Sequence, residues 1–235
     1  MAILHTNPIL IVAAVLPAAL LMFFVHRADK LEKEPTVLLW RLILWGVIAT
    51  GLAFIAEWIG MKVLSWFFTS YSTLYSLLLN FLVIALSEEF FKYIVLKWRT
   101  WKSPYFDCRF DGIVYAVFVS LGFALWENIE YVAQLGLIGA LIRALTAVPG
   151  HACFGVFMGA WYGAAKSHEK NGRAAESARC RKLAVICPAL LHGLYDFIAT
   201  TDGGGISWTF VGFVLIMFVA AFRMIRRLSK ADHYL

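Results

Sequence analysis

The stretch LYSLLLNFLVIALSEEFFKYIVL, residues 74–96, is apolar over a length that can cross a lipid bilayer, since a span needs about 20 mostly apolar residues. Its second half nevertheless contains Glu88, Glu89 and Lys92. An ionisable side chain at the centre of a membrane helix costs roughly 2.5 to 3.5 kcal/mol on insertion scales. A span that keeps three of them indicates a polar helix face turned toward other helices, and so predicts a helical bundle in a membrane.

Similar apolar windows recur along the whole chain. Of its 235 residues, 61% are hydrophobic and 15% charged, against about a quarter charged in soluble domains. We therefore predict an all-α, polytopic membrane protein with a single integral membrane domain over residues 1–235 and a motif-bearing core at about 85–199. It has about seven transmembrane helices, or eight if an ambiguous segment (57–73 or 135–147) forms another. The seven windows are residues 8–25, 36–56, 74–96, 111–131, 149–165, 183–200 and 206–225.

The net charge of +6 is explained by where the cations lie along the chain, so no nucleic-acid partner is expected. Seventeen Lys and Arg residues fall in alternate connections and at the carboxyl end, including the polar loop 166–182, whereas the opposite connections hold only Lys62 and Arg143. Positive charge is retained on the cytoplasmic side of membranes. The pattern predicts a multi-pass protein of the cell (plasma or inner) membrane, with its amino terminus outside and its carboxyl terminus in the cytoplasm.

Four-residue spacing places several polar side chains on shared helix faces. Glu88 precedes Lys92 by four residues, which is the favourable order for an ion pair within a helix. Glu89 is turned by about 100° from Glu88, so it can face a different neighbour, and the two carboxylates need not both serve the lysine. The other two sets are Glu127 with Tyr131, and His192 with Asp196, and Asn128 lies beside Glu127.

A further histidine belongs with these residues. His151 continues a row formed by Gly155, Gly159 and Gly163, and a row of small residues permits close helix approach. His151 should therefore point into the bundle. Because ionisable groups inside a membrane avoid lipid and gather at functional sites, we expect one hydrated cavity between the third, fourth, fifth and sixth spans to contain Glu88 or Glu89, Glu127, His151, His192 and Asp196.

Such a set supplies a general base for water together with donors or metal ligands for a carbonyl oxygen, which are the parts needed to hydrolyse an amide. The chain has no HExxH motif and no serine in the Gly-x-Ser-x-Gly setting of a nucleophile, so the usual metalloprotease helix and a serine nucleophile are poorly supported. A proton- or cation-coupled transporter using the same carboxylates is the alternative function. A scaffold that uses the polar site only for helix association is a third.

Four short motifs resemble those of the PrsW-type intramembrane protease family. They are EExxK at residues 88–92, GFAxxENxxY at 122–131, His-Ala at 151–152 and HGLYDF at 192–197. Their order and their placement on separate spans are also similar. The resemblance implies membership of the superfamily of type II CAAX prenyl endopeptidases, and cleavage of a membrane-anchored protein such as an anti-sigma factor.

The resemblance also implies roles for individual residues. Glu88 or Glu89 would activate water, with Glu127, His151 and His192 completing the catalytic site. Two versions stay open: a metal-free glutamate mechanism, and a metal-dependent one in which Glu127, His151 and His192 bind a divalent ion such as zinc. Lys92 would keep the partnering glutamate ionised, and Asn128, Tyr131 and Asp196 would orient the groups in contact with substrate.

Overall fold

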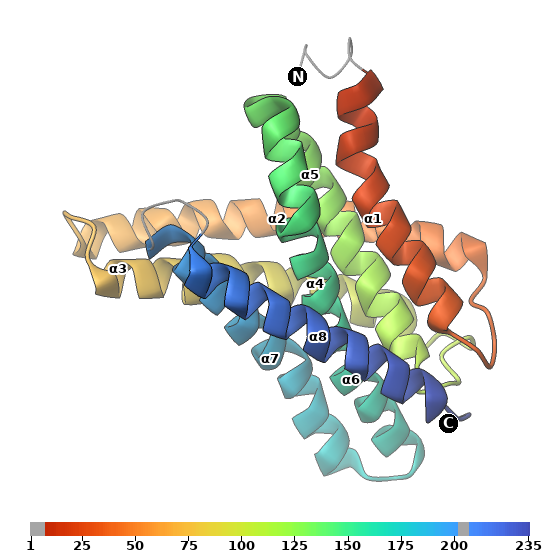
Figure 1. The fold of residues 1–235 in the computed structure, drawn as a ribbon. Coiled ribbons are helices and arrows are strands. Elements are labelled where there is room, and N and C mark those ends of the chain that lie inside the picture. The colour runs from red at the N-terminus through yellow and green to blue at the C-terminus, as the bar shows by residue number, and fades with distance from the viewer. Residues whose placement is uncertain (1–7, 202–206) are drawn as a thin grey trace.

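A computed structural model describes residues 8–201 and 207–235, and its regular elements in that range are helices (Figure 1). Seven helical stretches within the described residues are long and apolar enough to cross a membrane. The predicted all-α bundle of seven spans is therefore confirmed. In chain order the elements are α1 (Pro8–Ala28), α2 (Thr36–Phe67), α3 (Thr73–Leu78), the π-helix η1 (Leu79–Ala85), α4 (Leu86–Thr100), α5 (Asp111–Leu145), α6 (Ala147–Lys170), α7 (Ala174–Thr201) and α8 (Trp208–Lys230).

The two ambiguous segments extend neighbouring spans. Residues 57–67 continue α2, so the expectation of a separate interfacial or extra helix at 57–73 is wrong. In the segment 135–147 the chain reverses at Gly136, whose φ of 67° lies in the region that glycine adopts without strain. The residues that follow lead into the fifth span, Leu141–Lys170. The fifth span therefore begins earlier than predicted and carries Arg143 within it.

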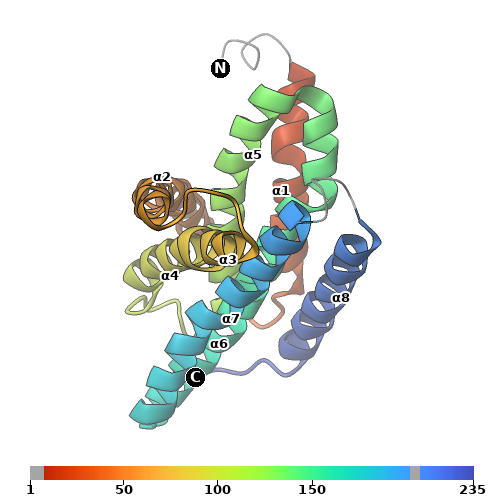
Figure 2. The same cartoon turned by 90° about the vertical axis from the view of Figure 1, so that its left-hand side faces the viewer.

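Helix α5 lies at the centre of the molecule. Every residue from 111 to 124 is buried, with α1, α2 and α6 packed around the helix. The third span, formed by α3, η1 and α4, lies beside α2, and both run crosswise to α1 and α5 (Figures 1 and 2). Apolar side chains such as Trp40, Phe54 and Ile216 are exposed on the outer surface, as expected of a surface that faces lipid tails.

Small residues bring α5 and α6 into backbone contact. A Cβ atom on Gly159 would lie 2.4 Å from the carbonyl oxygen of Gly112, and one on Gly163 would lie 2.2 Å from that of Arg109. The glycine row of α6 therefore allows α5 and α6 to pack closely. This packing fixes the register of α6 against α5, and with it the position of His151 relative to Glu127.

We expect Gly159→Leu to destabilise the protein by more than about 3 kcal/mol, because the new side chain would overlap backbone atoms that cannot move independently. Thermal unfolding in detergent micelles measures the effect. Gly51→Leu is the matched control, since nothing lies within 4 Å of a Cβ there. Equal unfolding temperatures for the two variants would contradict the packing argument.

Candidate active site

The centre of the site is the ammonium group of Lys92, which is completely buried. Its Nζ donates to Glu88 Oε2 at 3.1 Å and to Glu89 Oε1 at 2.7 Å. The predicted pair of Glu88 and Lys92 is thus present. Glu89 also faces a different neighbour, His192, but the two carboxylates share the lysine, because its long side chain reaches both the i−3 and the i−4 carboxylate.

His151, on α6, connects this ion pair to Glu127. Its Nδ1 lies 3.1 Å from Lys92 Nζ, and its Nε2 lies 2.8 Å from Glu127 Oε2. An ammonium can only donate, so Nδ1 accepts its proton and Nε2–H donates to the carboxylate. The two contacts select one tautomer of the ring.

His192, on α7, faces carboxylates through both ring nitrogens. Nδ1 lies 3.0 Å from Glu89 Oε1, and Nε2 lies 3.3 Å from Asp196 Oδ2. Its ring stacks on Phe154 at a centroid distance of 4.6 Å and meets the ring of His151 at 5.3 Å. Carboxylates and aromatic packing together hold the imidazole in a single orientation.

Arg143 is a site residue that the sequence reasoning missed. Its guanidinium binds Glu127 Oε2 at 2.9 Å and Asn128 Oδ1 at 3.1 Å, and lies 4.0 Å above the ring of Tyr131. The amide of Asn128 also donates to the carbonyl of Ala14 on α1 at 2.7 Å. A signal was available, since Arg143 is the one arginine in an otherwise apolar stretch from 135 to 147.

Glu57 is the second residue that was missed. It lies on the part of α2 that was not expected to belong to a span, within electrostatic reach of Glu127, His192 and Lys92. Asn80, on the π-helix η1, donates to Thr200 Oγ1 at 3.2 Å and lines the cavity described in the next paragraph, which Glu57 does not line. Single π-helical turns inside helices are frequent at functional sites.

A cavity of about 200 Å³ opens beside these side chains. Glu88 lines it, whereas Glu89 does not and has no exposed surface. Of the nine residues singled out from the sequence, all belong to this cavity or to the network behind it. Its lining is Asn80, Ile84, Glu88, Glu127, Tyr131, Arg143, Ala147, His151, Phe154, His192, Tyr195, Asp196, Ala199 and Thr200.

The donor atoms close enough to share a metal ion belong to Glu88, Glu89, His151 and His192, all within 4.8 Å of one another. Glu127, a ligand in the sequence hypothesis, is not in this group. In this arrangement Lys92 Nζ already contacts three of the four groups. A metal ion would have to displace a buried ammonium, so the arrangement described here does not fit one.

Comparison with known proteins gives a consistent result. The family model described as PrsW family intramembrane metalloprotease matches residues 34–224. Proteins named Protease PrsW are similar over nearly their whole length. The one from Oceanobacillus iheyensis is 33% identical over 93% of this chain and 95% of that protein; the one from Bacillus subtilis is 31% identical over 94% and 95%. No solved structure is significantly similar to the chain.

Proposed function

The chain belongs to the PrsW family and is an intramembrane endopeptidase, and from this premise we propose that Glu88 is its general base in a metal-free glutamate and histidine site. The observation that carries the proposal is the cavity itself. Glu88, His151 and His192 come from three different helices and line one polar space inside an apolar bundle. Such placement is costly for packing alone and suits the chemistry of amide hydrolysis.

In the proposed reaction Glu88 takes a proton from a water molecule, and the hydroxide formed attacks the carbonyl carbon of the scissile peptide bond. As the substrate binds, its carbonyl oxygen would share the Nε2–H of His151 with Glu127 and the Nε2–H of His192 with Asp196, and these donors stabilise the negative charge that develops on that oxygen. Glu88 then passes its proton to the leaving amine as the C–N bond breaks. The products are a new carboxyl terminus and a new amino terminus.

The other residues position these groups. Glu89 does not line the cavity, and it holds Lys92 and His192 in place through contacts of 2.7 and 3.0 Å. Arg143 and His151 share the carboxylate of Glu127, so Glu127 orients His151. Asp196 does the same for His192. We therefore assign Glu127 to orientation within the catalytic site, with Asn128 and Tyr131 fixing Arg143.

The substrate we propose is a single-span membrane protein, and an anti-sigma factor is the specific class that the motif resemblance implies. The test is cleavage of a single-span reporter by the purified protein in liposomes. His192→Ala should be inactive while still folded. A transporter would instead leave the reporter intact and dissipate a proton gradient, and that result would overturn the proposal.

The charge asymmetry supports an amino terminus outside and the loop 166–182 in the cytoplasm. Lys170→Cys should react with a membrane-impermeant thiol reagent only after the cells are permeabilised. Ser70→Cys, on the opposite side in the exposed connection between α2 and α3, should react in intact cells, and the native protein gives the background labelling. Labelling of Lys170→Cys in sealed cells would reverse the assignment.

A further inference from the structure

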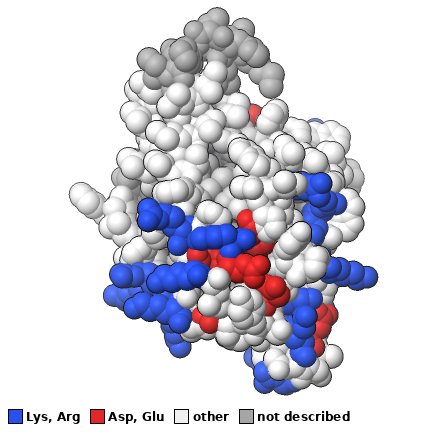
Figure 3. All heavy atoms as spheres, turned by 90° about the vertical axis from the view of Figure 1, so that its right-hand side faces the viewer, with Lys and Arg blue, Asp and Glu red and all other residues white. Residues whose placement is uncertain are grey.

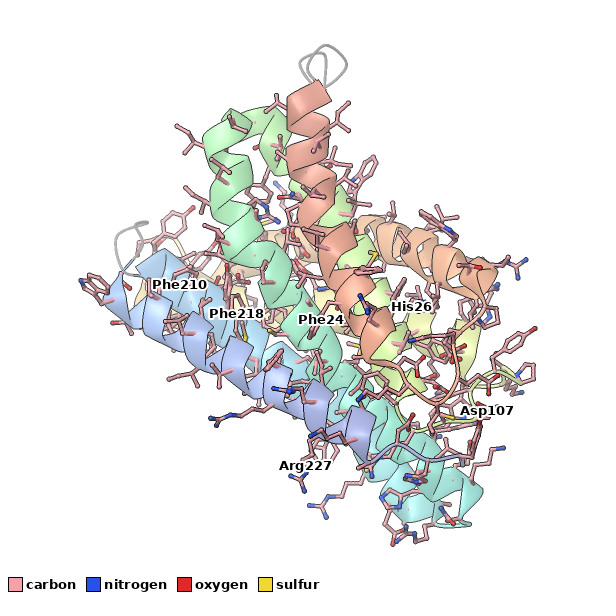
Figure 4. The ribbon with its side chains drawn as sticks, turned by 45° about the vertical axis from the view of Figure 1, so that its right-hand side comes forward. Phe24, His26, Asp107, Phe210, Phe218 and Arg227 are labelled. Carbon is pink, nitrogen blue, oxygen red and sulfur yellow. The ribbon has the colours of Figure 1, made fainter. Side chains whose placement is uncertain are left out.

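A groove between α1, α6 and α8 lies on a different face of α6 from the catalytic cavity. Helix α6 presents His151 to the cavity, and Ala152 and Val156 to the groove. One part of the groove, which we call the slot, has a volume of about 220 Å³, and among the described residues no side chain that lines it carries a nitrogen or oxygen atom. Phe24 of α1 and Phe218 of α8 line the slot between the two helices (Figure 4). The slot is therefore an apolar recess in the surface that faces lipid.

The end of the groove is basic. Beside Phe222 the slot continues into a wider part, the mouth, at the end of the molecule where α1 and α8 finish. Figure 3 shows Lys and Arg side chains gathered at this end. The mouth is lined by four basic side chains, all of them exposed, which are Lys30, Arg223, Arg226 and Lys230.

The charge of the mouth is not neutralised by the protein. None of the four cations forms an ion pair within the described ranges. Acidic side chains also lie on this side of the molecule (Figure 3), but none lines the groove in the described part of the chain. The groove thus joins an apolar recess to uncompensated positive charge.

Contacts between α1 and α8 fix the boundary between slot and mouth. The ring of Phe222 stacks on that of Phe24 at a centroid distance of 5.9 Å, and the guanidinium of Arg226 lies 5.4 Å from the centroid of the Phe222 ring. Ser229 donates a hydrogen bond to the backbone carbonyl of Ala28. These contacts keep the cations at the end of the apolar recess.

We propose that the groove binds one anionic glycerophospholipid, with an acyl chain in the slot and its phosphate among the cations of the mouth. With the orientation proposed above, the mouth lies in the cytoplasmic leaflet, where basic pockets between membrane helices bind anionic headgroups. The planar guanidinium groups of Arg223 and Arg226 suit phosphate oxygens. A bound lipid would bridge α1 and α8.

Charge decides between a lipid and the membrane helix of a protein partner. A single-span protein carries Lys and Arg next to the cytoplasmic end of its helix. These residues would meet the like charges of Lys30, Arg226 and Lys230 in the mouth, whereas a phosphate meets opposite charge. The mouth therefore favours an anionic lipid.

The test uses the full-length protein in detergent and needs no protease assay. Native mass spectrometry with added dioleoyl phosphatidylglycerol or dioleoyl phosphatidylcholine gives the affinity for each lipid, and the anionic lipid should bind more tightly by about tenfold. The double variant Arg226→Gln and Lys230→Gln should weaken phosphatidylglycerol binding by about tenfold or more. The matched control is Lys170→Gln with Arg173→Gln, which removes the same charge from exposed positions in the loop 166–182 and should bind as the native protein does.

Ala221→Leu tests the slot separately, because Ala221 lines it and the larger side chain would fill part of it. This variant should weaken phosphatidylglycerol binding while every cation stays in place; should it fail to fold, the double glutamine variant decides alone. Equal affinity for the two lipids, or native phosphatidylglycerol affinity in the double glutamine variant, would overturn the proposal. So would photo-crosslinking of Phe222→benzoylphenylalanine to the reporter's membrane helix instead of lipid, in liposomes that contain phosphatidylglycerol.

Discussion

Glu88→Gln should fold and insert normally yet lose cleavage of a single-span reporter by a factor of about 10² to 10⁴, the usual contribution of a general base. Glutamine has nearly the shape of glutamate but does not accept a proton from water at neutral pH. Glu88 lines the cavity and is 5% exposed, so its carboxylate can reach a water there. Initial cleavage rates of the purified proteins give the ratio.

Glu130→Gln provides the matched control, because Glu130 lies on the exposed side of α5, three residues beyond Glu127. It should cleave at the native rate. Glu89→Gln tests the role of Glu89 in holding the site together. It should lower the unfolding temperature by weakening the contacts with Lys92 and His192. Cleavage of the reporter by Glu88→Gln at the native rate would exclude Glu88 as the general base.

Lys92→Met should destabilise the fold by about 3 to 5 kcal/mol, the usual cost of removing one partner from a buried ion pair. Glu88 and Glu89 would both lose the ammonium that compensates their charge, and His151 would lose the donor to Nδ1. Activity should fall with stability. Thermal and denaturant unfolding in detergent measure the loss.

Lys92→Met should lose more stability at pH 8 than at pH 6. A carboxylate left without the ammonium can be neutralised by taking up a proton, and lower pH favours that uptake. Lys62→Met, at an exposed position on α2, is the matched control and should behave like the native protein. If the stability and activity of Lys92→Met are unchanged across this pH range, Lys92 does not hold the site together.

Helical spacing was enough to predict the contacts made within single helices. The i, i+4 rule found Glu88 with Lys92 and His192 with Asp196, and both pairs are present. The row of glycines correctly predicted that His151 points toward the interior of the bundle. These predictions succeed because the direction of a side chain on a helix is set by the local backbone.

Contacts between distant segments could not be predicted in this way. Arg143 reaches Glu127 only because the chain reverses at Gly136, a change in one φ angle that spacing does not reveal. The predicted apolar window, 36–56, ends just before Glu57, although α2 continues to Phe67.

In the proposed mechanism Glu88 activates water for peptide hydrolysis without a metal ion. The most direct measurement is cleavage of a single-span reporter by the purified protein in liposomes, after exhaustive chelation and in ¹⁸O-labelled water, with the products analysed by mass spectrometry. We expect native cleavage rates, one ¹⁸O atom in the new carboxyl terminus after a single turnover, and no product from Glu88→Gln. Loss of cleavage on chelation with recovery on adding zinc, or undiminished product from Glu88→Gln, would contradict the account.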